Sequence, residues 1–107
     1  MLKTISPIDN SIYVKRDFAD FDQIEKTLNF SKESFYQWKN TPLIERKKII
    51  TLFVENFLKN NEEIEEQLCR QMGRPINQCG GEMRGFKERA LYMIDISNNA
   101  LEIIIKN

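Results

Sequence analysis

The most constraining feature of this sequence is the run from Thr41 to Pro75, TPLIERKKIITLFVENFLKNNEEIEEQLCRQMGRP. It predicts a long helix over 42–59, a break at Asn60-Asn61 and an acidic helix over 61–72. At about 100° per residue, the apolar side chains of the first helix cover an arc of roughly 240°, whereas a helix lying on one core needs little over 100°. Such a helix needs protein on two of its sides. The side chains concerned are Ile49, Ile50, Leu52, Phe53, Val54, Phe57 and Leu58.

Length and composition limit what the rest of the chain can supply. A chain of 107 residues is long enough for one domain with a modest core. Its 16 basic and 16 acidic residues balance, so no overall field attracts nucleic acid or an anionic membrane. No stretch approaches the ~20 apolar residues of a membrane span, and MLKTISPIDN lacks the apolar run of a signal peptide. A cytoplasmic location is therefore expected.

Residues able to carry chemistry are few. Histidine is absent, which removes the commonest general base and the commonest metal ligand. Cys69 and Cys79 fit no CxxC or zinc spacing, and a nucleophilic cysteine needs a depressed pKa and an oxyanion hole. Both are interpreted as reduced structural thiols on helices. We predict no catalytic, cofactor-binding or metal-binding residue in this chain.

Residues 3–15 are predicted to form a β-hairpin. Pro7 presets φ for a turn, and Asn10 tolerates the left-handed backbone region that turns often require. A lone hairpin is only marginally stable in water, so we expect this one to dock on another part of the protein.

A first helix is predicted over 20–39, with Asp20 as its N-cap and Gln23 as the other half of a capping box. Its apolar side chains recur at three- and four-residue steps and are expected to be buried. An aromatic platform for bases or a cofactor is the less favoured interpretation, since this spacing is typical of a core-facing helix. The stripe consists of Phe21, Ile24, Leu28, Phe35 and Trp38, with Ser31 in the remaining place.

The next two helices carry opposite charge runs. Thr41 is the expected N-cap of the 42–59 helix, with Pro42 in its first turn, and Asn60 is the expected N-cap of the 61–72 helix, with Glu63 completing a capping box. The cluster Arg46-Lys47-Lys48 and the carboxylates of Glu62, Glu63, Glu65 and Glu66 are interpreted as solvated helix faces. Phosphate binding by the first and acid–base catalysis by the second are the alternatives.

The last helix is predicted over 75–101, after a left-handed cap at Gly73. Gly80-Gly81 resembles no phosphate loop, because no strand precedes it and no Gly-Lys-Ser/Thr follows; close helix packing is the better explanation. Residues 102–107 turn to β-branched side chains and are predicted to open a strand. The apolar face of the last helix consists of Ile76, Cys79, Met83, Phe86, Ala90, Ile94 and Leu101.

The segments QWKNTPLIERKKII and LCRQMGRPI resemble the N-terminal helical region of the NAD(P)-dependent aldehyde dehydrogenases. In that family an aromatic-Trp helix end, a Thr-Pro helix start and a Met-Gly-(Lys or Arg)-Pro turn occupy the corresponding places. The resemblance extends from about Ile5 to Leu101. It implies a mainly α fragment of the family's α/β fold, with an N-terminal hairpin and about four helices forming a single partial domain.

The family resemblance also implies an activity, the oxidation of an aldehyde to a carboxylic acid with hydride transfer to NAD or NADP. The family's nucleophilic cysteine, general-base glutamate and cofactor-binding glycines have no match in these 107 residues. The chain is therefore expected to be an N-terminal scaffolding segment, inactive alone, that associates with the remainder of a parent enzyme or with itself. The alternative is a stand-alone helical interaction module, binding through the 42–59 helix and Ile103–Ile105.

Overall fold

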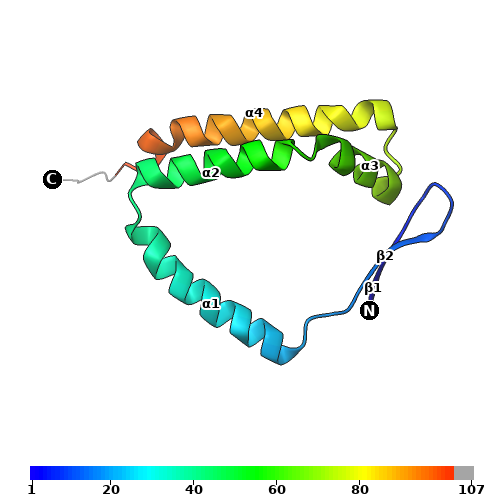
Figure 1. The fold of residues 1–107 in the computed structure, drawn as a ribbon, viewed down its shortest axis with the longest axis horizontal. Helices are drawn as coiled ribbons and strands as arrows, with labels where there is room; N and C mark the ends of the chain where they lie inside the picture. The colour runs from blue at the N-terminus through cyan, green and yellow to red at the C-terminus, as the bar shows by residue number, and fades with distance from the viewer. Residues whose placement is uncertain (103–107) are drawn as a thin grey trace.

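The computed structural model describes residues 1–102, which form a hairpin followed by four helices (Figure 1). This confirms the predicted mainly helical class with an N-terminal hairpin. Glu102 belongs to no helix or strand, and the remainder of the strand predicted at 102–107 lies outside the described residues. The elements are β1 (Leu2–Ile5), β2 (Ile12–Arg16), α1 (Phe21–Asn40), α2 (Leu43–Leu58), α3 (Asn61–Met72) and α4 (Ile76–Ala100).

The β1–β2 hairpin is antiparallel and carries one bulge. Thr4 pairs with Val14 and Ile5 with Ile12, so Tyr13 is the extra residue on β2. The turn is closed by the Ser6 amide, which donates to the Ser11 carbonyl at 2.8 Å. Asn10 adopts a φ of 61°, which confirms the left-handed position predicted for it.

The hairpin docks on the turn between α3 and α4, as Figure 1 shows. Gly73 has a φ of 71°, which confirms the predicted left-handed cap, and its amide donates to the Cys69 carbonyl at 2.9 Å. A Cβ added to Gly73 would lie 2.8 Å from Cγ of Pro7. The hairpin tip therefore rests on backbone that only glycine leaves open.

The core lies where α4 packs against α2 and α3, along the upper side of Figure 1. Within the described chain, the buried apolar side chains are Val54 of α2 and Cys79 and Met83 of α4. Phe57 of α2 packs against Phe86 of α4 with the two rings tilted and their centroids 4.6 Å apart. Near one end of the pair, Lys47 Nζ donates to Asn98 Oδ1 at 3.2 Å.

Helix α1 begins as predicted but is not buried. Asp20 Oδ1 accepts from the Gln23 amide at 2.8 Å, and Gln23 Oε1 accepts from the Asp20 amide at 3.0 Å, which confirms the capping box. The expected burial of the stripe is wrong: Phe21 is 86% exposed, and Ile24, Leu28, Phe35 and Trp38 are all exposed as well. The physical reason is that no other described element lies over this face of α1.

Two of the predicted helix caps are also wrong. The Thr41 hydroxyl donates backwards to the Gln37 carbonyl at 2.9 Å, so Thr41 ends α1 instead of starting α2, and α2 begins one residue after Pro42. The Asn60 side chain likewise donates to the Asn56 carbonyl at 3.3 Å and does not cap α3. In both cases the carbonyls at the end of the preceding helix compete for the side chain.

The molecule is extended for its length. The radius of gyration of its Cα atoms is 18.9 Å, against about 13 Å for a compact domain of this size. Figure 1 shows the cause: α1 diverges from the α2–α4 pair, and only the hairpin that precedes α1 lies near α3. This arrangement leaves open the apolar sides of α1 and α2 that the sequence predicts to face a core.

Candidate functional site

A groove of about 460 Å³ lies between α2 and α4. Val54 and Phe86 lie at its floor, where the two helices pack, and Trp38 of α1 closes one end. Its lining is mostly apolar and carries no carboxylate. The lining residues are Trp38, Leu43, Arg46, Lys47, Ile50, Phe53, Val54, Phe86, Ala90, Met93, Ile94, Ser97 and Leu101.

Helix α2 has a second apolar face beyond the groove. Val54 is 2% exposed against α4, whereas Ile49 is 50% and Leu52 57% exposed. These two residues lie more than about 90° around the helix from Val54. The sequence predicted that α2 needs protein on two sides, and within the described chain only one of them is covered.

The junction between α1 and α2 fixes the direction in which α1 leaves the groove. Thr41 and Pro42 both have extended backbone, with ψ of 127° and 143°. The Thr41 amide donates to the Trp38 carbonyl at 3.1 Å, and Arg46 Nε donates to the Thr41 carbonyl at 3.1 Å. Only Trp38 of the α1 stripe consequently reaches the groove. The sequence analysis missed this junction, because it assigned Thr41 to the wrong helix.

The basic cluster on α2 is engaged within the chain. Arg46 and Lys47 are half-buried at the groove and bond to Thr41 and Asn98, so they are less solvated than Lys48. Lys48 is exposed and pairs with Glu45 at 3.0 Å. A surface pair of this kind contributes little to stability. The three cations therefore do not converge on a common point where a phosphate could bind.

The two cysteines lie on different helices, α3 and α4. Cys79 is completely buried, and burial raises the pKa of its thiol, which opposes formation of the thiolate that a nucleophile needs. Its Sγ lies 3.5 Å from the Pro75 carbonyl oxygen. Cys69 is half-buried on α3. Both are free thiols in the structure.

Two of the α3 carboxylates bond to side chains of their own helix. Glu66 pairs with Arg70 at 3.0 Å, and Glu63 accepts from Gln67 at 3.2 Å, each within the same helix. Glu65 is half-buried beside Gly80 of α4. Within residues 1–102, no three His, Cys, Asp or Glu side chains group closely enough to hold a metal ion.

The doubled glycine lies within α4, and only its first residue, Gly80, lies close to another helix. A Cβ on Gly80 would lie 3.5 Å from Glu65 Oε1 of α3, which supports the expected close approach of the two helices. A Cβ on Gly81 would meet only Arg84 Nη2, at 3.7 Å, so this second glycine has no packing role of that kind. Among the described helices, none is long and apolar enough to cross a membrane.

Comparison with known proteins points in the same direction as the sequence motifs. Residues 1–105 match the model of the aldehyde dehydrogenase family. The chain is 24% identical over 87 residues to D-glyceraldehyde dehydrogenase (NADP(+)) of Thermoplasma acidophilum, covering 81% of the chain. It is 24% identical over 90 residues to N-succinylglutamate 5-semialdehyde dehydrogenase of Photorhabdus laumondii, covering 84% of the chain. No solved structure matches the chain.

The match concerns a small part of each relative. The chain spans 18% of the length of these two proteins, and 16% of an N-succinylglutamate 5-semialdehyde dehydrogenase of Vibrio cholerae to which it is 24% identical over 75 residues. The family match nevertheless covers the hairpin and all four described helices. The chain belongs to the aldehyde dehydrogenase family.

Proposed function

We propose that this chain is the N-terminal scaffolding segment of an NAD(P)-dependent aldehyde dehydrogenase and that it is inactive alone. In this role the open faces of α1 and α2 pack on the remainder of the enzyme, which oxidises an aldehyde to a carboxylic acid. The family match over residues 1–105 and the 16–18% coverage of the relatives support the assignment.

The observation that carries the proposal is the uncovered apolar stripe of α1. A 20-residue helix with a capping box and regularly spaced large apolar side chains is built to lie on a core, yet none of its residues is buried. Burying five such side chains at about 1.5–3 kcal/mol each would contribute substantially to stability. This gain is realised only when further protein covers α1.

The described residues do not fit a nicotinamide dinucleotide. Binding its pyrophosphate takes backbone amides at a helix start after a strand, whereas Gly80 and Gly81 lie inside the first turns of α4. Arg84 and Glu65 side chains already lie against Gly80. We therefore assign no cofactor contact and no catalytic step to residues 1–102, and the proposal places both in the remainder of the enzyme.

The test is to incubate the purified 107-residue chain with aldehydes and either NAD or NADP while following the absorbance of the reduced nicotinamide. We expect no turnover above a protein-free control. A Cys69→Ser variant provides the matched control, because Cys69 is the more accessible of the two thiols. Turnover by the unaltered chain that disappears in Cys69→Ser would contradict the proposal.

A further inference from the structure

The α1 stripe is long enough to span the α2/α4 groove. Along α2 the groove runs from Leu43 to Val54, about 16 Å at 1.5 Å per residue, and along α4 from Phe86 to Leu101, about 22 Å. On α1, the stripe from Phe21 to Trp38 is about 25 Å long. A helix with this stripe can lie in the groove along its full length, as a third helix packed on two others.

The two surfaces also match in chemistry. An amphipathic helix binds an apolar groove through anchors on one face, spaced three and four residues apart. Leu28 and Phe35 are such anchors, and both are more than half exposed. The groove offers Ile50 and Phe53 on one wall and Met93 on the other. Ala90 gives the α4 side a small residue where a large anchor can enter.

The chain's own α1 is held away from the groove. The extended backbone at Thr41 and Pro42 and the Arg46–Thr41 hydrogen bond fix the junction, so that Trp38 alone reaches the groove. Proline at position 42 also disfavours the helical conformation for Thr41, which maintains the break. The groove therefore stays open to an α1 helix from outside the molecule.

The area available is sufficient for a stable dimer. The five exposed side chains of the α1 stripe present on the order of 600 Å² of accessible surface. Reciprocal exchange forms two such contacts, so the two α1 stripes alone would bury on the order of 1,200 Å², to which the covered grooves add; specific interfaces bury about 1,200–2,000 Å². When two copies exchange the same helix, the dimer has two-fold symmetry, and both α1 helices and both grooves are occupied.

We propose that two copies of this chain pair by reciprocal exchange of α1, so that the stripe of each α1 lies in the α2/α4 groove of the other copy. This association belongs to the 107-residue chain itself. It goes beyond the scaffolding role, and it does not require any aldehyde dehydrogenase activity.

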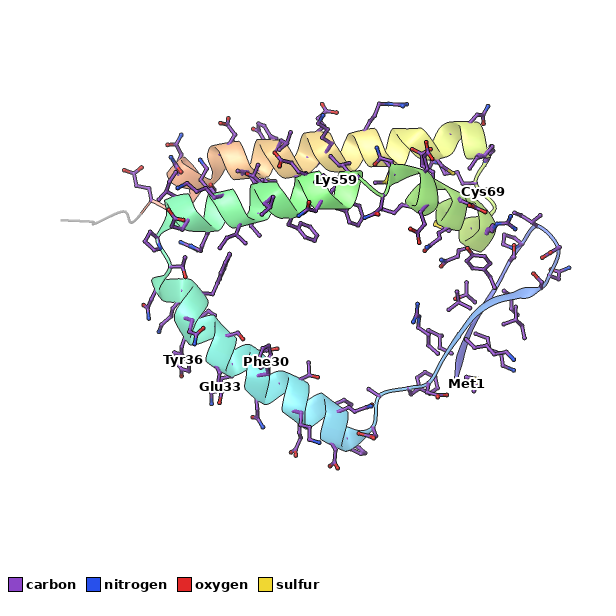
Figure 2. All side chains as sticks on the ribbon, in the orientation of Figure 1. Met1, Phe30, Glu33, Tyr36, Lys59 and Cys69 are labelled. Atoms are coloured by element: carbon purple, nitrogen blue, oxygen red, sulfur yellow. The ribbon has the colours of Figure 1, made fainter. Side chains whose placement is uncertain are left out.

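Light scattering coupled to size-exclusion chromatography, run over a concentration series, gives the first test. We expect twice the mass of the chain at high concentration. Phe35→Glu places a charge in the stripe and is expected to raise the dissociation constant of the dimer at least about tenfold. The matched control is Phe30→Glu. Phe30 lies on the same helix (Figure 2) and is 71% exposed. At about 100° per residue, it lies roughly 160° around the helix from Leu28. This control variant should leave the dissociation constant unchanged.

Disulfide trapping identifies which surfaces meet. A Leu28→Cys chain is mixed with a Met93→Cys chain under mild oxidation, and the unaltered chain controls for Cys69 and Cys79. We expect a covalent heterodimer from the mixture. A monomer at every concentration would overturn the proposal, as would a Leu28→Cys/Met93→Cys chain that closes only within itself. An equal loss of dimer in Phe30→Glu and Phe35→Glu would also overturn it. Aldehyde turnover tests the scaffolding role separately, so failure of one leaves the other standing.

Discussion

At the scale of single residues, Gly73 and Ser6 determine how the hairpin contacts the turn between α3 and α4. Gly73 combines a positive φ with the contact to Pro7, so one residue both ends α3 and seats the hairpin. Ser6 is buried in the turn, and its hydroxyl accepts from the Ile8 amide at 3.3 Å. Gly73 and Ser6 therefore hold the hairpin in place, since the hairpin has few buried side chains of its own.

Replacing Gly73 by alanine should destabilise the chain. The left-handed backbone costs about 1 kcal/mol for a residue with a Cβ, and displacing Pro7 adds to that. We expect the free energy of unfolding, measured by urea titration of the helical circular dichroism, to fall by about 1–2 kcal/mol. Gly81→Ala is the matched control, with space for its Cβ inside a helix, and should raise stability by about 0.5–1 kcal/mol. Changes of the same sign in both variants would be inconsistent with these backbone roles.

The hairpin turn also contains a residue whose charge depends on folding. Asp9 Oδ1 accepts from the Ser11 hydroxyl at 2.6 Å and from the Ser11 amide at 3.0 Å, and these bonds lower the pKa of Asp9. Because its pKa is lower in the folded turn, ionised Asp9 stabilises the turn above the pKa of the unfolded chain. That contribution is lost as the pH falls through the folded pKa. Ser11→Ala should raise the pKa of Asp9, as followed by NMR titration of its carboxyl carbon. Ser34→Ala on α1 should not change it, and an unchanged value in Ser11→Ala would contradict the assignment.

At the scale of elements, the helices could be predicted from local signals, whereas their burial could not. The capping box at Asp20, the left-handed Gly73 and the apolar periodicities all depend on residues close together in the chain, and these predictions are confirmed. The caps at Thr41 and Asn60 fail because each side chain has a competing carbonyl one turn earlier. Burial of α1 depends on long-range partners, which periodicity does not reveal.

The α1 capping box offers a prediction at this scale. With no residue of α1 buried, the helix depends on its cap more than a packed helix does. Asp20→Ala should lower the helical circular dichroism and cost about 1 kcal/mol of helix stability. Asp22→Ala removes a carboxylate from the same turn without removing the cap bond and should cost less. Equal losses in the two variants would show that the charge matters and the cap does not.

At the scale of the whole molecule, the candidate site was predictable only in outline. The 240° arc of α2 indicated that it needs cover on two sides, and α4 supplies one of them. The groove itself joins residues of α1, α2 and α4 that are far apart in the sequence, so periodicity within one helix could not locate it. We therefore expect that protein other than the described residues covers the α1 stripe and fills the α2/α4 groove.

Fluorescence of Trp38 tests this claim most directly, because Trp38 is the only tryptophan in the chain and lines the end of the groove. It is 37% exposed in the single chain, and an α1 helix from a second copy would shield it. The account predicts that its emission maximum moves to shorter wavelength as the chain is concentrated, returns on dilution, and does not move in Phe35→Glu. An emission maximum independent of concentration in the unaltered chain, identical to that of Phe35→Glu, would contradict it.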